Sequence, residues 1–531
     1  MRLLNATTFE FEEFLGPCPA YAILSHRWQD DEVSLQDMSS GRATGKSGYS
    51  KIDMCCREAI KHSLKFAWID TCCIDKTSSA ELTEAINSMY RWYQDAKVCF
   101  VYLSDVQESE VDVQDLDALD TSQFSHSSWW TRGWTLQELI APSVLEFYNS
   151  EWKFLGSKHD LIDLIPAITG IHRKMLERGS DPESFSVAQR MSWASKRTTT
   201  RTEDIAYSLV GIFGVNMPML YGEGERAFIR LQEEIMKHSN DHSLFAWTVQ
   251  NEGYRGLLAK SPASFQHSYD VIPSIKRLSE VPYFVTNFGL SITLAFMPWT
   301  MDTYLVALDC EREDRYDSRV GIYLKLLPEK DQAARVSLDG IDLKTFELSN
   351  FPLIHLQQTY VRQRVWGITP QPDRLYGFWI RTLPPTIMLA TESQNVASDS
   401  CQPIYRTEVL SRNVWHDRER FLNMQVGDRG TAGRIWYESP DKSRYMVFKL
   451  GFDDGFNPVC LCSSHEVEMS LRDLPVTDTK WLQYRVGGNH GYLQGDRLTG
   501  MREIVQLVAV SISKEVVGGQ RMWVVDIQRV V

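Results

Sequence analysis

Two polar segments carry side chains whose types and positions could perform chemistry. The tetrapeptide Ser25-His26-Arg27-Trp28 closes the apolar run YAILSH, and Asp70 closes the apolar run FAWID. Ligands of open parallel sheets bind beyond the carboxyl ends of the strands, so these side chains are predicted to line one rim. The alternative is that His26 and Asp70 only cap the ends of buried strands.

A third segment could add a carboxylate beside aromatic rings. Trp130, Trp134 and Glu138 fall at i, i+4 and i+8, which predicts one helical face with two indoles and one carboxylate. A carboxylate between apolar walls is poorly screened, and such groups are candidates for functional sites. The alternative is a core-facing stripe with a glutamate at its edge.

Alternating strand and helix patterns over the first 105 residues supply the elements that would position these groups. The runs YAILSH, FAWIDTCCID and VCFVYLSDV are typical of buried strands, and GYSKIDMCCREAIKHSL has helical periodicity. A second amphipathic helix is predicted after a capping box at Ser78 and Glu81. Strands separated by helices favour a parallel sheet and an α/β domain.

Patterns further along divide the chain into three parts. Residues 1–155 are predicted to form the α/β core, and residues 156–254 a helical extension in which Thr200 and Glu203 form a capping box. Residues 255–531 are rich in short β-type runs and are predicted to form a mainly antiparallel β region that ends in a hairpin around Gly518-Gly519.

Composition indicates an ordinary soluble globular protein. The 531 residues are 43% hydrophobic and 24% charged, and the net charge is −13, which argues against nucleic-acid backbone binding. The N-terminus has no secretory signal pattern and no long uncharged apolar run exists, so no membrane span is expected. The ten cysteines lack metal-ligand spacing, which predicts free thiols in the cytoplasm and no metal site.

A segment that looks like a phosphate-binding loop does not satisfy the motif. Gly41 and Gly45 enclose three residues instead of four before Lys46-Ser47, and the preceding segment SLQDMSS is polar rather than strand-like. Nucleoside triphosphate hydrolysis is therefore not expected.

Many motifs in order closely resemble the fungal heterokaryon-incompatibility (HET) domain over about residues 20–247. They are AILSHRW, GYSKIDMCCREA, FAWIDTCCID, SAELTEAINSMYRWYQDAKVCFVYLSDV, SSWWTRGWTLQELIAP and WASKRTTTRTEDIAYSLVGIFGVNMPMLYGEG. The resemblance implies a role in self/non-self recognition and programmed, incompatibility-type cell death. HET domains are regarded as distant relatives of TIR domains, which implies a TIR-like (flavodoxin-like) parallel sheet. The β-rich remainder resembles only the variable C-terminal regions of such proteins.

The TIR comparison implies a catalytic residue. The strand that ends in Ser25-His26-Arg27 resembles the first TIR strand and its loop. The segment SSWWTRGWTLQEL resembles the TIR helix that supplies the catalytic glutamate, which here would be Glu138. The segment departs from the TIR pattern because two extra turns separate its Ser-Trp pair from that glutamate.

The implied reaction is NAD+ hydrolysis, with NAD+ as substrate and no resident cofactor. The nicotinamide of NAD+ is already a cationic leaving group, and the ribose develops oxocarbenium character, which one preorganised carboxylate can stabilise. Trp130 or Trp134 could stack on a base, and Arg27 or Arg132 could hold the pyrophosphate. The groups on the strand-end rim would complete the binding site.

Two hypotheses from different classes follow. The chain is a cell-death effector that hydrolyses NAD+, or its HET domain is a non-enzymatic module that acts by homotypic assembly. The partners expected are a second copy of the HET domain and an unknown incompatibility protein, and the β-rich region is expected to sense a ligand or restrain the HET domain. A cleft shared by Glu138, His26 and Asp70 would favour the enzyme.

Overall fold

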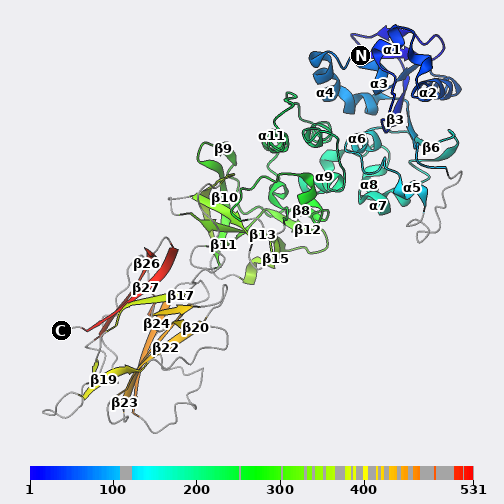
Figure 1. The fold of residues 1–531 in the computed structure, drawn as a ribbon. Coiled ribbons are helices and arrows are strands. Elements are labelled where there is room, and N and C mark those ends of the chain that lie inside the picture. Colours follow the sequence, from blue (N-terminus) through cyan, green and yellow to red (C-terminus); the bar gives the residue numbers. More distant parts are fainter. Residues whose placement is uncertain are drawn as a thin grey trace.

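The computed structural model describes most of the first 364 residues and, beyond them, chiefly strands. The described ranges are 1–107, 122–249, 253–299, 303–327, 332–337, 341–350, 354–364, 377–383, 387–389, 399–404, 414–416, 420–423, 430–438, 444–452, 458–466, 484–485, 508–517 and 520–529. Figure 1 shows an α/β part at the N-terminus, helices in the middle of the chain and strands toward the C-terminus.

A seven-stranded sheet organises the N-terminal part. Its strands are, in spatial order, β2 (Phe11–Glu13), β1 (Arg2–Asn5), β4 (Phe66–Trp68), β3 (Tyr21–His26), β5 (Val98–Tyr102), β6 (Leu145–Tyr148) and β7 (Phe154–Ser157). The strands β4, β3, β5 and β6 run parallel and the outer ones pair antiparallel, which confirms the predicted α/β part with a parallel sheet. The chain order reverses at β3, so the carboxyl end of β3 lies at a position where α/β sheets bind ligands.

Apolar strands and amphipathic helices build this part of the molecule. All six residues of β3 are buried, as expected for a parallel strand covered on both faces. The long helices α2 (Tyr49–Lys61) and α4 (Ser79–Asp95) each bury one apolar face. The shorter helices are α1 (Leu35–Ser39), η1 (Ala43–Gly45), α3 (Asp70–Cys73), α5 (Gln123–His126) and α6 (Thr135–Ile140).

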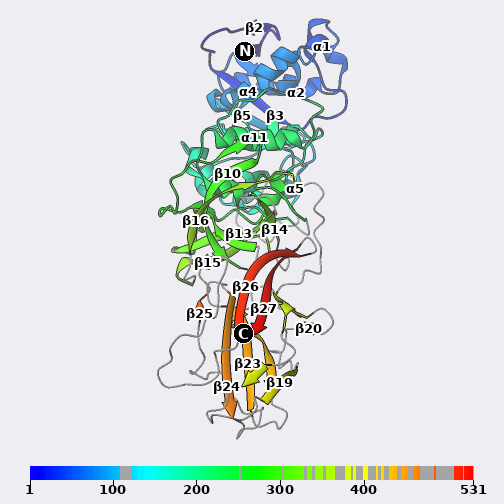
Figure 2. The same ribbon diagram turned by 90° about the vertical axis from the view of Figure 1, so that its left-hand side faces the viewer.

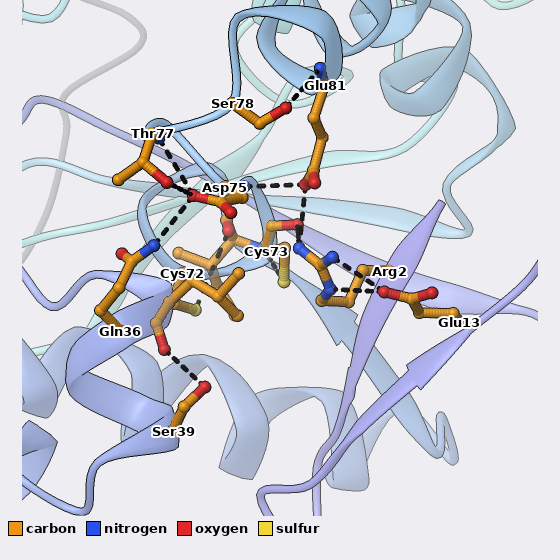
Figure 3. Close-up of polar contacts among 12 residues, drawn as sticks. Arg2, Glu13, Gln36, Ser39, Cys72, Cys73, Asp75, Thr77, Ser78 and Glu81 are labelled. Carbon is orange, nitrogen blue, oxygen red and sulfur yellow. Dashed lines mark hydrogen bonds and ion pairs between the residues drawn. The ribbon is translucent and has the colours of Figure 1, made fainter.

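A polar network fixes the segment between α3 and α4 (Figure 3). Ser78 caps α4 by accepting from the Glu81 backbone N–H, as predicted, at 3.3 Å. The Glu81 carboxylate, however, accepts from the Asp75 backbone N–H at 2.7 Å and from Arg2 of β1 at 2.9 Å. Gln36 of α1 donates to the Asp75 side chain at 2.8 Å. Three elements therefore hold the turn that follows Asp70 in place.

Short helices form most of the predicted extension. They are α7 (Leu164–Thr169), α8 (Arg173–Leu176), η3 (Pro182–Ser184), α9 (Val187–Ala194), α10 (Asp204–Tyr207), α11 (Arg226–Met236) and η4 (His242–Phe245), and η5 (Pro262–Phe265) follows beyond the predicted boundary at residue 254. The capping box predicted at Thr200 and Glu203 is wrong. Helix α10 begins only at Asp204, and the Glu203 carboxylate accepts instead from the backbone N–H groups of Gly222 and Gly224 at 2.8 and 3.0 Å.

The remaining strands are mainly antiparallel, as predicted (Figure 2). The first group is β8 (Val271–Pro273), β9 (Phe284–Thr286), β10 (Gly289–Pro298), β11 (Thr303–Ala307), β12 (Cys310–Arg312), β13 (Ser318–Leu326), β14 (Gln332–Val336), β15 (Lys344–Glu347) and β16 (His355–Val361), with η6 (Leu348–Asn350) after β15. The second group is β17 (Gly377–Thr382), β18 (Ile387–Leu389), β19 (Asp399–Ile404), β20 (Val414–His416), β21 (Phe421–Asn423), β22 (Gly430–Glu438), β23 (Arg444–Phe452), β24 (Pro458–Glu466), β25 (Tyr484–Arg485), β26 (Val508–Val517) and β27 (Gln520–Arg529). The predicted terminal hairpin is present, with Val517 opposite Gln520, and Gly518-Gly519 lies outside the described residues.

One continuous hydrophobic core joins the α/β part, the helices and the first β strands. Its buried members extend from Leu3 to Val361. Arg335 of β14 is fully buried and donates through Nη1 to the carbonyl of Phe245 at 2.8 Å and through Nη2 to that of Trp247. The helices and this β sheet therefore pack as one body.

The adjacent cysteine pairs lie in this core. Cys55, Cys56, Cys72 and Cys73 are buried thiols that form no disulfides. Burial raises the pKa of the Cys56 thiol to about 12, so it stays protonated at neutral pH. Within the described part of the chain, no helix is both long and apolar enough to cross a membrane.

Candidate functional site

A cavity of about 330 Å³ opens at the carboxyl end of β3 and receives the carboxylate of Glu138. Its wall also contains His26 and Asp70, which were predicted to lie on one rim. The full lining is His26, Trp28, Asp70, Ile74, Lys76, Leu82, Ile86, Met89, Arg132, Trp134, Thr135, Glu138, Thr200, Arg201, Asp204 and Tyr221. The cleft that would favour an enzyme is therefore present.

Glu138 is the most deeply placed charged group of this cavity. It lies on α6 and is 6% exposed, and one of its carboxylate oxygens accepts a hydrogen bond from the Ser25 hydroxyl. The Ser25 hydroxyl oxygen accepts in turn from Trp129 Nε1 at 2.9 Å. Burial raises the pKa of Glu138 to about 8, although the bond from Ser25 opposes the shift. Neighbouring Asp70 adds to the increase through its charge.

A backbone pairing before α6 sets the direction of Glu138. The Gly133 N–H donates to the Thr198 carbonyl at 2.8 Å, and the Thr198 N–H donates to the Thr131 carbonyl at 2.7 Å. A Cβ on Gly133 would lie 2.4 Å from the Thr199 methyl group, so only glycine permits this approach. Residues 128–131 form turns and Arg132 forms a β-bridge with Thr198, so helix α6 begins only at Thr135.

The predicted helical face of Trp130, Trp134 and Glu138 is therefore wrong. Trp130 precedes the helix and is buried, and its indole N–H donates to the Phe124 carbonyl at 2.7 Å. Its ring packs edge-on against the Phe124 ring, with 5.4 Å between centroids. Trp134 stands at the N-cap position of α6 and lines the cavity beside Glu138.

Two arginines flank α6. Arg197 is buried and donates to the Arg132 carbonyl and to the Thr135 hydroxyl, both at 2.9 Å. Burial lowers the pKa of Arg197 to about 9, while the charge of Glu138 opposes the shift. Arg132 lines the cavity, and its guanidinium donates to the Thr200 hydroxyl at 3.1 Å. The carboxylate thus has a cation on each side.

His26 and Asp70 present unused polar atoms to the cavity. Neither ring nitrogen of His26 has a hydrogen-bond partner among the described residues, and one Asp70 oxygen, Oδ1, has none either. His26 Nε2 and Asp70 Oδ1 are 4.0 Å apart, which is too far for a hydrogen bond. Burial lowers the pKa of His26 to about 3 and raises the pKa of Asp70. Buried polar atoms without partners are costly, so a bound ligand would satisfy them.

Trp28 and Lys76 form one edge of the opening. The Trp28 indole N–H donates to Asp70 Oδ2 at 2.7 Å, and the Lys76 ammonium lies 3.4 Å from the centroid of the Trp28 ring. Trp28 is 43% exposed, so one part of this ring is available to solvent or to a ligand. The edge combines a cation with an aromatic surface.

The eight binding residues predicted from the sequence divide into three groups. His26, Trp28, Asp70, Arg132 and Trp134 line the cavity. Ser25 is buried behind Glu138, where it orients the carboxylate.

The last group lies away from the cavity. Trp130 belongs to the core, and Arg27 is exposed and does not line the cavity. Of the two residues proposed for the pyrophosphate, only Arg132 is suitably placed.

Sequence reasoning missed the contribution of the helical extension. Thr200, Arg201, Asp204 and Tyr221 complete the wall of the cavity. The segment TTTRTED was interpreted only as a helix start, and its charged residues next to a turn were the signal that could have indicated a site. Within the described residues, no group of three or more His, Cys, Asp or Glu side chains is arranged to hold a metal ion.

Comparisons with known proteins agree with the motifs. Residues 21–126 match the family model of the heterokaryon incompatibility protein (HET), and residues 226–270 match a domain of unknown function, DUF8212. The vegetative incompatibility protein HET-E-1 of Podospora anserina is 51% identical over 225 residues, which make up 42% of this chain and 16% of that protein. The chain thus spans about one sixth of the length of the relative it matches. No solved structure matches the chain.

Proposed function

We propose, from the premise that the chain carries a HET domain, that it acts in heterokaryon incompatibility by hydrolysing NAD+ in the cavity at the carboxyl end of β3. The observation that carries the proposal is the placement of Glu138. Its buried carboxylate faces a cavity that also holds His26 and Asp70, instead of solvent or a sealed core. Depletion of NAD+ would account for a cell-death role.

The cavity suits the chemistry of this cleavage. As the C–N bond to nicotinamide breaks, the bonding electrons neutralise the pyridinium ring and the ribose carbon becomes cationic. Water then attacks that carbon and yields ADP-ribose and a proton. A carboxylate fixed by Ser25 opposes the developing charge without reorganisation, and Glu138 is fixed in this way.

The protonation state of Glu138 couples to the charge of the ligand. With a pKa of about 8, the carboxyl group of the free protein is largely protonated at neutral pH. A cationic nicotinamide ring beside it would favour the ionised form, since an opposite charge within a few ångströms lowers a carboxyl pKa. The oxidised, positively charged dinucleotide is therefore the form of substrate that the site favours.

The other groups of the wall have roles in binding. Trp134 offers an indole next to Glu138 on which a planar ring can stack, and Arg132 can donate hydrogen bonds to a phosphate. The two ring nitrogens of His26 and the Oδ1 atom of Asp70 can form hydrogen bonds with ribose hydroxyl groups, because these atoms are buried and have no partner among the described residues. TIR enzymes, which HET domains resemble, support the same assignment of the carboxylate.

The test is incubation of the purified chain with NAD+ and separation of the products by chromatography. Free nicotinamide and ADP-ribose in equal amounts are expected. If neither forms, while the chain still causes cell death when it is expressed, the non-enzymatic module that acts by homotypic assembly takes the place of the enzyme. A cytoplasmic location fits either outcome, because both substrate and partner copies would be found there.

A further inference from the structure

The helical extension supplies a second set of ligand-type groups at the outer end of the cavity. Arg201, Asp204 and Tyr221 line the cavity, and Arg201 and Tyr221 are exposed (Tyr221 by 37%), whereas Glu138 is 6% exposed. The Arg201 guanidinium lies 4.5 Å from the centroid of the Tyr221 ring. The outer end of the cavity therefore presents a cation already held on an aromatic face.

Tyr221 is rigidly held. The Tyr221 hydroxyl donates to Asp204 at 3.0 Å, and its ring packs edge-on against Tyr207 with 5.5 Å between centroids. The Tyr207 hydroxyl accepts from the Leu220 backbone N–H at 2.8 Å. The Glu203 carboxylate accepts from the backbone N–H groups of Gly222 and Gly224, which directly follow Tyr221 along the chain. The Tyr221 side chain therefore loses little conformational freedom when a ligand binds, which favours a preorganised ligand site.

The cations are ordered along the cavity. Arg132 is half-buried and Arg201 is exposed, although both line the cavity. Arg201 lies on the ring of the exposed Tyr221, whereas Arg132 precedes the helix that carries the buried Glu138. Arg201 is therefore the outer of the two cations.

The volume of the cavity indicates that a dinucleotide would extend past its inner part. About 330 Å³ is at the small end of the roughly 300–1,000 Å³ that sites for drug-sized ligands occupy. The nicotinamide nucleotide would fill this space when its reacting bond lies at Glu138. The second nucleotide would then leave the cavity at its outer end, beside Tyr221.

We propose that Arg201 and Tyr221 form a subsite for the second nucleotide of the substrate, with Arg201 bonding the outer phosphate. This subsite makes the enzyme selective for a dinucleotide over nicotinamide mononucleotide, which ends at the phosphate near Arg132. The proposal rests on the NAD+ hydrolysis proposed above, and it assigns the selectivity to the helical extension rather than to the parallel sheet.

The kinetic test compares kcat/KM for NAD+ and for nicotinamide mononucleotide in Arg201→Ala. A hydrogen bond to a charged group is lost for the dinucleotide only, so the ratio of the two values should fall by about 10-fold or more. Arg201→Lys should recover part of the ratio, because a single charge remains. Arg57→Ala is the matched control, since the Arg57 side chain is 65% exposed on α2, where it pairs with Asp53, and does not line the cavity. An unchanged ratio in Arg201→Ala overturns the proposal.

A binding measurement separates this proposal from the proposed reaction. ADP-ribose binding to the full chain, measured by calorimetry, requires no catalysis. Affinity should fall about 10-fold in Arg201→Ala and stay the same in Arg57→Ala. If NAD+ is not cleaved but this loss is found, the subsite stands and the hydrolase does not. If NAD+ is cleaved and ADP-ribose binds equally to both variants, or to neither, the subsite is overturned.

Discussion

At the scale of single residues, the burial of Glu138 predicts a pH-dependent stability. Its carboxyl group has a pKa of about 8 in the folded chain against an ordinary value of 4.5. The folded state therefore binds more protons between these values. The stabilisation from this group is complete below about pH 4.5 and is lost as the pH rises to about 8.

The thermal midpoint measured from pH 5 to pH 9 tests this prediction. The midpoint of Glu138→Gln, whose side chain cannot ionise, should rise relative to that of the unmodified chain as the pH increases. The two should be most similar near pH 5, and most of the difference should already be present at pH 7, because the glutamate is ionised in the unfolded chain above about pH 4.5 and must take up a proton on folding. Parallel curves over the whole range would show that Glu138 titrates near its ordinary pKa.

Ser25 is predicted to position Glu138 rather than to bind substrate. Its hydroxyl group donates to the carboxylate and so lowers the pKa of Glu138. In Ser25→Ala the pH profile of kcat should shift to higher pH. The free energy of unfolding should also fall by about 1–3 kcal/mol, because the indole N–H of Trp129 loses its partner.

Ser127→Ala provides the control for the positioning role. Ser127 is 2% exposed, and its hydroxyl donates to Asp105 at 2.7 Å, outside the cavity. This variant should lose stability without a change in the pH profile. A profile that moves equally in both variants would mean that Ser25 acts only through the fold.

At the scale of elements, the sequence predicted the framework well and the local geometry of the site less well. The strands that end at His26 and Trp68 were visible as apolar runs, and their parallel pairing follows from the helices between them. The start of α6 was not predictable from periodicity. It depends on Gly133 pairing with Thr198, a contact between segments 65 residues apart.

The same long-range contact explains which site residues were found. His26 could be placed in the cavity because it ends β3, and strand direction determines its position. Asp70 was predicted at a strand end but is the first residue of α3, because β4 stops at Trp68. Arg201 and Tyr221 could not be placed, since only the packing of the extension brings them to the cavity. Trp130 was misplaced because helical spacing was applied to a segment that is not helical.

Gly133→Ala tests the importance of this pairing. The added methyl group would meet the Thr199 side chain at 2.4 Å, so the backbone must separate or strain. Overpacking of this kind lowers the free energy of unfolding by about 1–3 kcal/mol. The rate of nicotinamide release should also fall, because α6 carries Glu138. Gly45→Ala, where a Cβ would meet nothing within 4 Å, should change neither quantity in urea unfolding and activity assays. A neutral Gly133→Ala would contradict the role of the pairing.

At the scale of the whole molecule, no described residue beyond Tyr221 lines the cavity. The first β strands nevertheless belong to the same core as the helices, and Arg335 bonds backbone carbonyls at the junction. The prediction that the β-rich region senses a ligand or restrains the HET domain stays untested. The shared core shows that removal of everything after residue 255 would expose buried helix residues.

A pair of truncations tests this view of the core. A chain that ends at residue 364 keeps the strands that pack on the helices, so it should retain the fold of the N-terminal part and the proposed nicotinamide release. A chain that ends at residue 254 should unfold at a lower temperature or aggregate. Equal thermal stability of both chains would show that the junction around Arg335 contributes nothing to the N-terminal part.

The measurement that tests the central claim most directly is NAD+ cleavage by Glu138→Gln. The substitution keeps the shape of the side chain and removes the charge that opposes the ribose cation. Loss of one preorganised electrostatic group lowers a rate by about 10²–10³-fold, whereas the thermal midpoint at pH 7 should not fall, because glutamine takes up no proton on folding. The control is Glu84→Gln, at an exposed position on α4, which should cleave NAD+ at the normal rate. Cleavage by a folded Glu138→Gln at the same rate as its control would contradict the account.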